Sequence, residues 1–168
     1  MPRLLVVDCS IVSAFVDLGC LGKLNRLIRV RGFKLIIPDL VLRELVSKIT
    51  RSELRKRVRF SERTSRVAEI DRLRTRFISL GDGELSVISC ALTRVSRENE
   101  NPLVGLDDRT ARGVAKTLGL KVIGTIGLLK LMLDEHIISK KELAMYCKTL
   151  RSIGFYLTDK LILDLMRS

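Results

Sequence analysis

The chain has 168 residues, which fits one domain and is long enough to bury a core without disulfide or metal cross-links. Lys and Arg total 31 against 19 for Asp and Glu, and the resulting net charge of +12 favours a polyanionic partner, nucleic acid before an anionic membrane. A single histidine and an aromatic content of 4% exclude a zinc site built from several histidines, a two-histidine ribonuclease mechanism and an RRM-type stacking platform.

Short apolar runs alternate with helical patterns along the chain. Strands are expected at residues 4–7, 33–37, 77–80, 103–106 and 121–123, because continuously apolar runs of this length are typical of parallel strands buried on both faces. Helices are expected at 11–18, 21–30, 40–49, 85–95, 110–118 and 127–133, and residues 51–76 form a long basic amphipathic stretch. This alternation predicts a three-layer α/β/α sandwich around a mainly parallel five-stranded sheet.

The last thirty residues have a different pattern from the rest. Two short amphipathic helices, 140–150 and 159–166, are expected there on either side of an Ile-Gly-Phe turn. We therefore expect a main domain over residues 1–138 and a helical C-terminal appendage over 139–168, packed on the domain or on a partner.

Carboxylates follow the ends of four expected strands. The first strand is followed by Asp8, the second by Asp39 and Glu44, the third by Asp82 and Glu84, and the fourth by Asp107 and Asp108. Ligands of parallel sheets bind beyond the carboxyl ends of the strands, so these acids are expected at one edge. In a chain of net charge +12 this concentration points to a functional site.

Each acid also has a purely structural interpretation. Asp8 is able to cap the helix that follows it, although Ser10 is the better cap candidate. Glu44, taken alone, fits a solvated residue as well as a functional one. Glu84 lies on the apolar stripe of its expected helix and also in the first turn, where the helix dipole favours an acid.

Helix caps account for some of the remaining polar residues. Asp82 is expected to cap the helix that contains Glu84, and Asp107 and Asp108 compete for the cap of the next helix. One of that pair is expected to cap, which leaves the other for a different role. Thr125 is expected to cap the helix after the last strand.

Three or four converging carboxylates without histidine form a hard-oxygen site. Such a site suits Mg²⁺ or Mn²⁺ rather than zinc or copper. Because acids repel phosphate unless a cation lies between them, a site of this kind on a basic protein predicts metal-assisted cleavage of a phosphodiester.

The basic stretch 51–76 holds ten Arg or Lys residues and four acids. It fits either a solvated helix face or a clamp for an RNA backbone, with Arg55 and Arg59 as contacts. Arg109 and Arg112 flank the fourth acid and are either phosphate contacts or ordinary exposed helix residues.

Six segments carry a resemblance to a known family. They are LVVDCS at 5–10, PDLVLREL at 38–45, LGDGE at 80–84, LDDR at 106–109, VIGTIGLL at 122–129 and GFYLT at 154–158. In this order they resemble the PIN-domain ribonucleases, specifically the VapC-like toxin branch, over nearly the whole chain.

The resemblance implies a metal-dependent endoribonuclease, the toxin of a toxin–antitoxin pair. Asp8, supported by Ser10, would be the first metal ligand and Glu44 and Glu84 the next acids, whereas the fourth falls on Asp107 or Asp108, with Asp108 the nearer match. It also implies Mg²⁺ or Mn²⁺, an RNA substrate, a homodimer and a small antitoxin partner. The alternative is a non-catalytic RNA- or ribosome-binding module of the same fold.

Cysteine usage and hydropathy indicate the compartment. Cys9, Cys20, Cys90 and Cys147 are scattered, form no CxxC motif and lie in apolar surroundings, as structural thiols of a reducing cytosol do. No secretory leader is recognised and no apolar run approaches the roughly 20 residues of a membrane span. A cytoplasmic protein without membrane association is expected.

Overall fold

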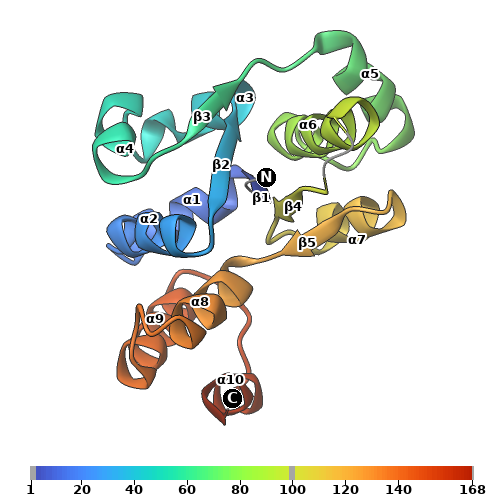
Figure 1. The fold of residues 1–168 in the computed structure, drawn as a ribbon. Coiled ribbons are helices and arrows are strands. Elements are labelled where there is room, and N and C mark those ends of the chain that lie inside the picture. Colours follow the sequence, from blue (N-terminus) through green and yellow to red (C-terminus); the bar gives the residue numbers. More distant parts are fainter. Residues whose placement is uncertain (1–2, 99–100, 168) are drawn as a thin grey trace.

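Five parallel strands form the centre of the fold in the computed structural model, which describes residues 3–98 and 101–167 (Figure 1). They are β1 (Arg3–Val7), β2 (Phe33–Pro38), β3 (Ser61–Arg63), β4 (Leu103–Gly105) and β5 (Lys121–Ile123), and they lie in the order β3-β2-β1-β4-β5. The side chains of β1 from Leu4 to Val7 are buried, because helices cover both faces of the sheet.

Helices form a layer on each side of the sheet (Figure 1). On one side α1 (Cys9–Asp17) and α2 (Leu21–Val30) pack against α8 (Thr125–Asp134), which in turn carries α9 (Lys140–Ser152). On the other side lie α5 (Val67–Arg76), α6 (Asp82–Glu98) and α7 (Arg109–Thr117), with α6 packed across β2, β1 and β4. The predicted three-layer sandwich is therefore confirmed.

A further set of helices connects and extends these layers. The link from β2 to β3 is made by α3 (Asp39–Glu44), a 3₁₀ turn (Leu45–Ser47) and α4 (Arg51–Arg57), and the chain ends in α10 (Asp159–Arg167). α9 begins with a capping box between Ser139 and Glu142 and adds buried side chains to the common core. Within the described residues no helix is both long and apolar enough to cross a bilayer.

The chain changes direction across the sheet between β1 and β4. From β1 it proceeds to β2 and β3 on one side, and it returns through β4 to β5 on the other. The crevice beyond the carboxyl ends of the strands at such a reversal is where open parallel sheets bind ligands. β1 and β4 approach closely here: the Asp8 N–H donates to the Gly105 carbonyl at 3.0 Å, and a Cβ on Gly105 would lie 2.8 Å from Cγ1 of Val7.

The expected strand at residues 77–80 is wrong. These residues connect α5 to α6, where Phe77 and Leu80 pack against the core while Ile78 is 86% exposed. The third strand is β3, a short and exposed edge strand of polar residues. Its sequence carries no apolar run, because an edge strand of this kind is held by backbone hydrogen bonds to β2 rather than by burial.

The basic stretch 51–76 is likewise not one continuous element, since β3 divides it into α4 and α5. The expected helix at 40–49 also divides, with α3 ending at Glu44 and the 3₁₀ turn following. This break places Glu44 at the end of its helix.

Candidate functional site

Asp8 lies at the carboxyl end of β1 and is only 5% exposed. It occupies the cap position of α1, so the expectation that Ser10 caps this helix is wrong. Ser10 instead donates its hydroxyl to Oδ2 of Asp8 at 3.0 Å. Burial raises the pKa of Asp8, the charge of Asp107 adds to the rise, and the hydrogen bond from Ser10 opposes it.

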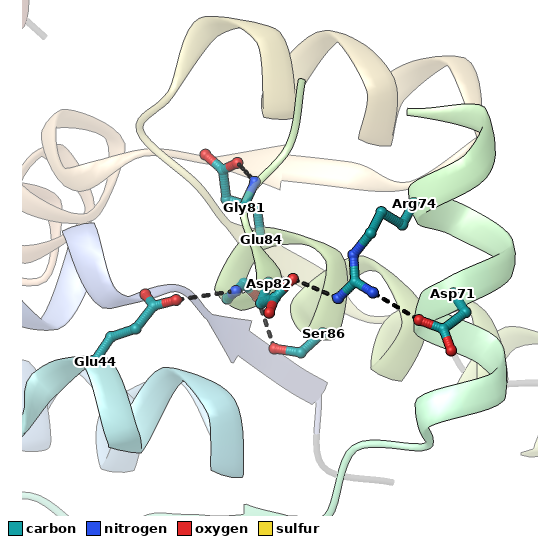
Figure 2. Close-up of polar contacts among 8 residues, drawn as sticks. Glu44, Asp71, Arg74, Gly81, Asp82, Glu84 and Ser86 are labelled. Atoms are coloured by element: carbon teal, nitrogen blue, oxygen red, sulfur yellow. Dashed lines mark hydrogen bonds and ion pairs between the residues drawn. The ribbon is translucent and has the colours of Figure 1, made fainter. Parts of the chain in front are cut away.

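Glu44 reaches from the end of α3 to the start of α6 (Figure 2). Its Oε1 accepts the backbone N–H of Gly83 at 3.1 Å, and a Cβ on Gly83 would lie 2.6 Å from the other carboxylate oxygen. Partial burial raises the pKa of Glu44 most, and repulsion from the charges of Asp8 and Glu84 raises it further. Although Glu44 is exposed, this contact and its repulsion from Asp8 and Glu84 place its carboxylate among the acids beyond the carboxyl ends of the strands. Asp8, Glu44, Glu84, Asp107 and Asp108 are together called the acidic edge.

Glu84 lies in the first turn of α6. Its Oε2 accepts the backbone N–H of Gly81 at 2.9 Å, so the carboxylate also satisfies a free N–H at the start of its own helix (Figure 2). The expected apolar stripe is present at Ile88 and Ala91, which are fully buried, but Val95 is exposed. Burial raises the pKa of Glu84, and the charges of Asp8 and Asp108 raise it further.

Asp82 is directed differently from its neighbour Glu84. It is the first residue of α6, and its Oδ1 lies 2.6 Å from Nη2 of Arg74 on α5. Arg74 also binds Asp71 on its own helix, as Figure 2 shows. Asp82 is therefore neutralised by an ion pair to α5, whereas Glu44 and Glu84 have no basic partner within the described part of the chain.

Asp107 is held by Thr125 at the start of α8. One carboxylate oxygen accepts the Thr125 N–H at 2.7 Å and the other accepts its hydroxyl at 2.6 Å. Thr125 is fully buried, and Gly124 rather than Thr125 occupies the cap position of α8, so the expected capping role is wrong. Burial raises the pKa of Asp107, whereas the bonds from Thr125 and the charge of Arg112 oppose the rise.

Asp108 is the residue of the pair that caps α7. Its Oδ1 accepts the Ala111 N–H at 2.8 Å, and the residue is exposed. The expectation that one of the two aspartates caps is confirmed, and Asp107 is the one left for another role. Both still face the acidic edge, since Asp107 perturbs the pKa of Asp8 and Asp108 that of Glu84.

The structure thus places five of the sequence-predicted acids around the reversal between β1 and β4, near enough for pairs of them to repel one another: Asp8, Glu44, Glu84, Asp107 and Asp108. The support that other residues give these acids was not predicted: the N–H groups of Gly81 and Gly83 bind Glu84 and Glu44, and Thr125, expected only as a helix cap, holds Asp107. Gly83 lies between two acids of the GDGE segment, and Thr125 directly follows a strand and a glycine. Those positions are the only hints in the sequence, because the partners lie far away along the chain.

The donor chemistry of this edge fits a hard divalent cation, since every donor is a carboxylate. Repulsion among these carboxylates contributes to the raised pKa values of Asp8, Glu44 and Glu84, and a cation between them would relieve it. In residues 3–98 and 101–167, no three acidic, cysteine or histidine side chains lie close enough to share a metal ion. Each carboxylate is held instead by a nearby N–H or hydroxyl group.

Two of the arginines expected to bind RNA lie beside the acids. Arg109, the first residue of α7, is exposed and follows Asp108 directly. Arg112 lies close to Asp107. A Cβ added to Gly124 would lie 2.5 Å from Nη1 of Arg112 and 2.8 Å from Oδ1 of Asp107, so both side chains meet at this glycine.

The other two expected RNA contacts lie along β3. Arg55 pairs with Glu62 at 3.4 Å and covers the ring of Phe60 at 4.6 Å from its centroid. Arg59 precedes β3, and its backbone N–H binds the side chain of Asn25 on α2. Both therefore lie before or beside the strand, not at its carboxyl end.

Arg63 was not predicted from the sequence as an RNA contact, and it ends β3 on the side of the acidic edge. It is in register with Pro38, which is level with Asp8 on the neighbouring strand. Two strand spacings, about 10 Å, therefore separate the backbones of Arg63 and Asp8. Arg63 is exposed and makes no ion pair with the described residues.

A comparison with protein-family models matches residues 4–168 to DUF3368, described as a PIN domain. The chain belongs to the PIN-domain family. The match covers both the sandwich and the C-terminal helices, and it agrees with the parallel sheet of this PIN domain. A search of curated proteins found no match to the chain. The family indicates a nuclease-type fold that acts on nucleic acid.

Proposed function

We propose that this PIN domain is a metal-dependent endoribonuclease. The observation that carries the proposal is the meeting of Asp8, Glu44, Glu84 and the Asp107–Asp108 pair where the sheet reverses direction. A protein of net charge +12 has no structural need to gather repelling carboxylates at one edge. Cleavage of a polyanion through a divalent cation explains both the acidic edge and the basic surface.

The acids of this edge have distinct roles in the proposal. Asp8, Glu84 and the Asp107–Asp108 pair would hold Mg²⁺ or Mn²⁺, and Glu44 would complete the catalytic set from the end of α3. A bound cation would offset charge on the scissile phosphate and lower the pKa of a water for attack. Ser10 fixes the orientation of Asp8 through its hydroxyl.

The basic residues would hold the RNA backbone around this centre. Arg109 and Arg112 lie on the side of Asp107, and Arg63 lies on the side of β3. Arg55 and Arg59 would extend the contact along β3 for a longer RNA. Phosphate contacts of this kind give affinity and register without sequence preference.

The biological setting is part of the same proposal. The GFYLT segment at 154–158 and the order of the other motifs support the VapC-like toxin branch. A cytoplasmic homodimer inhibited by a small antitoxin would follow from that branch. The coding frame immediately upstream tests this point, since a small DNA-binding protein is expected there.

The test of the activity is cleavage of labelled single-stranded RNA during a titration with Mn²⁺. Wild-type protein should cleave only with the cation, Asp8→Asn should abolish cleavage, and both should have cooperative thermal unfolding. Asp134→Asn, an exposed acid at the opposite end of α8, is the matched control and should cleave normally. Undiminished cleavage by Asp8→Asn in a preparation free of contaminating nuclease would refute the proposal.

Two further results of this assay are informative. Salt-sensitive RNA binding without cation-dependent cleavage would support the alternative, a non-catalytic RNA- or ribosome-binding module. Comparison of Asp107→Asn with Asp108→Asn identifies the fourth acid, since only the variant of the essential acid should lose cleavage. Asparagine at 108 keeps a side-chain oxygen for the cap of α7, so a loss there reports on the charge rather than on the helix.

A further inference from the structure

A cleft of about 510 Å³ lies between the C-terminal segment and the start of α8, next to the acidic edge. Its volume is that of an ordinary small-molecule site. Its walls come from the start of α7 and the residues before it, from the β5–α8 junction, and from the C-terminal segment up to α10, and they include Asp107, Arg112, Val122, Ile126, Tyr156 and Leu161. Asp107 belongs both to this cleft and to the proposed cleavage site, so the two are continuous.

Tyr156 is the most exposed large apolar side chain in the described part of the chain, at 92%. Its neighbours are anchored: Leu157 is buried, Phe155 packs against the core, and Arg151 donates from Nε to the Leu157 carbonyl at 2.7 Å. Gly154, with φ of +102°, allows the sharp change of direction that begins this segment. The ring of Tyr156 is therefore presented to solvent on a backbone that is held on both sides.

The walls of the cleft offer two kinds of contact. Val122, Ile126 and Leu161 provide apolar surface, whereas Arg112 provides a guanidinium that makes no hydrogen bond or ion pair with the described residues. Arg112 lies near Asp107 but makes no hydrogen bond to it, so its guanidinium keeps donors for a phosphate. A guanidinium and an exposed ring that line one cleft suit a nucleotide, since the base stacks on the ring and the phosphate binds the cation.

We propose that this cleft binds an unpaired nucleotide of the RNA strand, with its base stacked on Tyr156 and its phosphate on Arg112. The inference rests on the proposed function for the identity of the strand and adds to it a defined subsite on the Asp107 side of the cleavage site. Continuity with Asp107 and the positive charge of Arg112 favour a nucleotide over an apolar peptide segment as the occupant.

Tyrosine fluorescence offers a direct test of stacking. The chain has no tryptophan and two tyrosines, and the other one, Tyr146, is buried at 5% exposure. Metal-free protein titrated with a short oligouridylate should lose emission from Tyr156, after correction for absorption by the RNA. An abasic oligoribose phosphate should bind more weakly and leave the emission unchanged, and Tyr156→Ala should remove the response.

Affinity is measured in parallel in an Asp8→Asn background, so that cleavage does not consume the oligonucleotide. Tyr156→Ala should weaken binding by about five- to a hundredfold, the range for loss of one base–aromatic stack. Tyr156→Phe should restore it, because the ring remains. Met145→Ala on α9, also an exposed apolar residue but outside the cleft, should bind like its parent. In active protein Tyr156→Ala should raise KM more than it lowers kcat.

The outcomes separate this inference from the proposed function. Unchanged affinity of Tyr156→Ala in a protein whose wild type cleaves RNA would overturn the nucleotide subsite alone. Tyr156-dependent binding without cation-dependent cleavage would support the subsite and overturn the nuclease. If the loss of Tyr156 leaves RNA binding intact but prevents complex formation with a protein partner, the cleft is a protein-docking site and the inference is wrong.

Discussion

Thr125→Val should destabilise this PIN domain through the loss of one hydrogen bond at the acidic edge. Thr125 is fully buried, and its hydroxyl donates to the Asp107 carboxylate at 2.6 Å. Valine keeps the shape but leaves a carboxylate oxygen without that donor. Hydrogen bonds to charged groups contribute about 1.5–3 kcal/mol, so the melting temperature should fall by roughly 3–12 °C at neutral pH.

The matched control is Thr117→Val on α7. Its hydroxyl binds the Gly113 carbonyl in the same helix at 3.0 Å and is exposed, so the change should be within about 0.5 kcal/mol. The pH dependence gives a second check. Because the bond is strongest to the ionised carboxylate, the difference between Thr125→Val and wild type should shrink as Asp107 is protonated.

Calorimetry or thermal unfolding followed by circular dichroism measures both variants across pH. An Asp107→Asn background should reduce the cost of Thr125→Val, because the charged acceptor is gone. Equal melting temperatures for Thr125→Val and wild type at neutral pH, or an equal fall in Thr117→Val, would refute the reasoning.

Three further predictions follow from the acidic edge and its surroundings. Gly83→Ala places a Cβ 2.6 Å from the Glu44 carboxylate, which must swing away from the start of α6, so the proposed cleavage should fall while the melting temperature changes little. Gly22→Ala, with nothing within 4 Å, should keep both, and equal cleavage by the two variants would contradict the close approach. Asp8→Asn should raise the melting temperature of metal-free protein at neutral pH, because burial raises the pKa of Asp8 and its ionised form therefore opposes folding. The gain should disappear as the pH falls toward the unfolded-state pKa of about 3.9. A lower melting temperature of the variant at neutral pH would count against this prediction. Arg63→Ala should lower the slope of log affinity for single-stranded RNA against log salt by about 0.7, the effect of one phosphate contact, and an unchanged slope would exclude such a contact.

The sequence predicted the layers of the fold because its central strands are buried on both faces. β1 is apolar from Leu4 to Val7 and β2 is apolar apart from the exposed Lys34 for that reason, and the helices between them carry clear apolar stripes. β3 was not predicted, because three polar residues at the edge of a sheet show no apolar pattern. Residues 77–80 were wrongly predicted as a strand, because Phe77 and Leu80 are apolar residues that attach a connecting segment to the core.

The acids were predictable as a group because parallel strands place their carboxyl ends at one edge. The assignment of individual roles was not, since it depends on long-range contacts. Glu84 was predicted at the acidic edge because it follows residues 77–80, which are not a strand in the described structure. It lies at the edge because α6 begins there. Asp107 and Asp108 look equivalent in the sequence and differ only through Thr125 and the cap of α7.

The acidic edge draws its parts from almost the full length of the chain. Asp8 ends the first strand, and Thr125, which holds Asp107, follows the last one. During synthesis on the ribosome the early acids emerge long before the residues that complete their surroundings. A nascent or truncated chain that stops before α8 therefore lacks the two hydrogen bonds that hold Asp107, so any activity that needs an oriented Asp107 begins only after Thr125 has emerged.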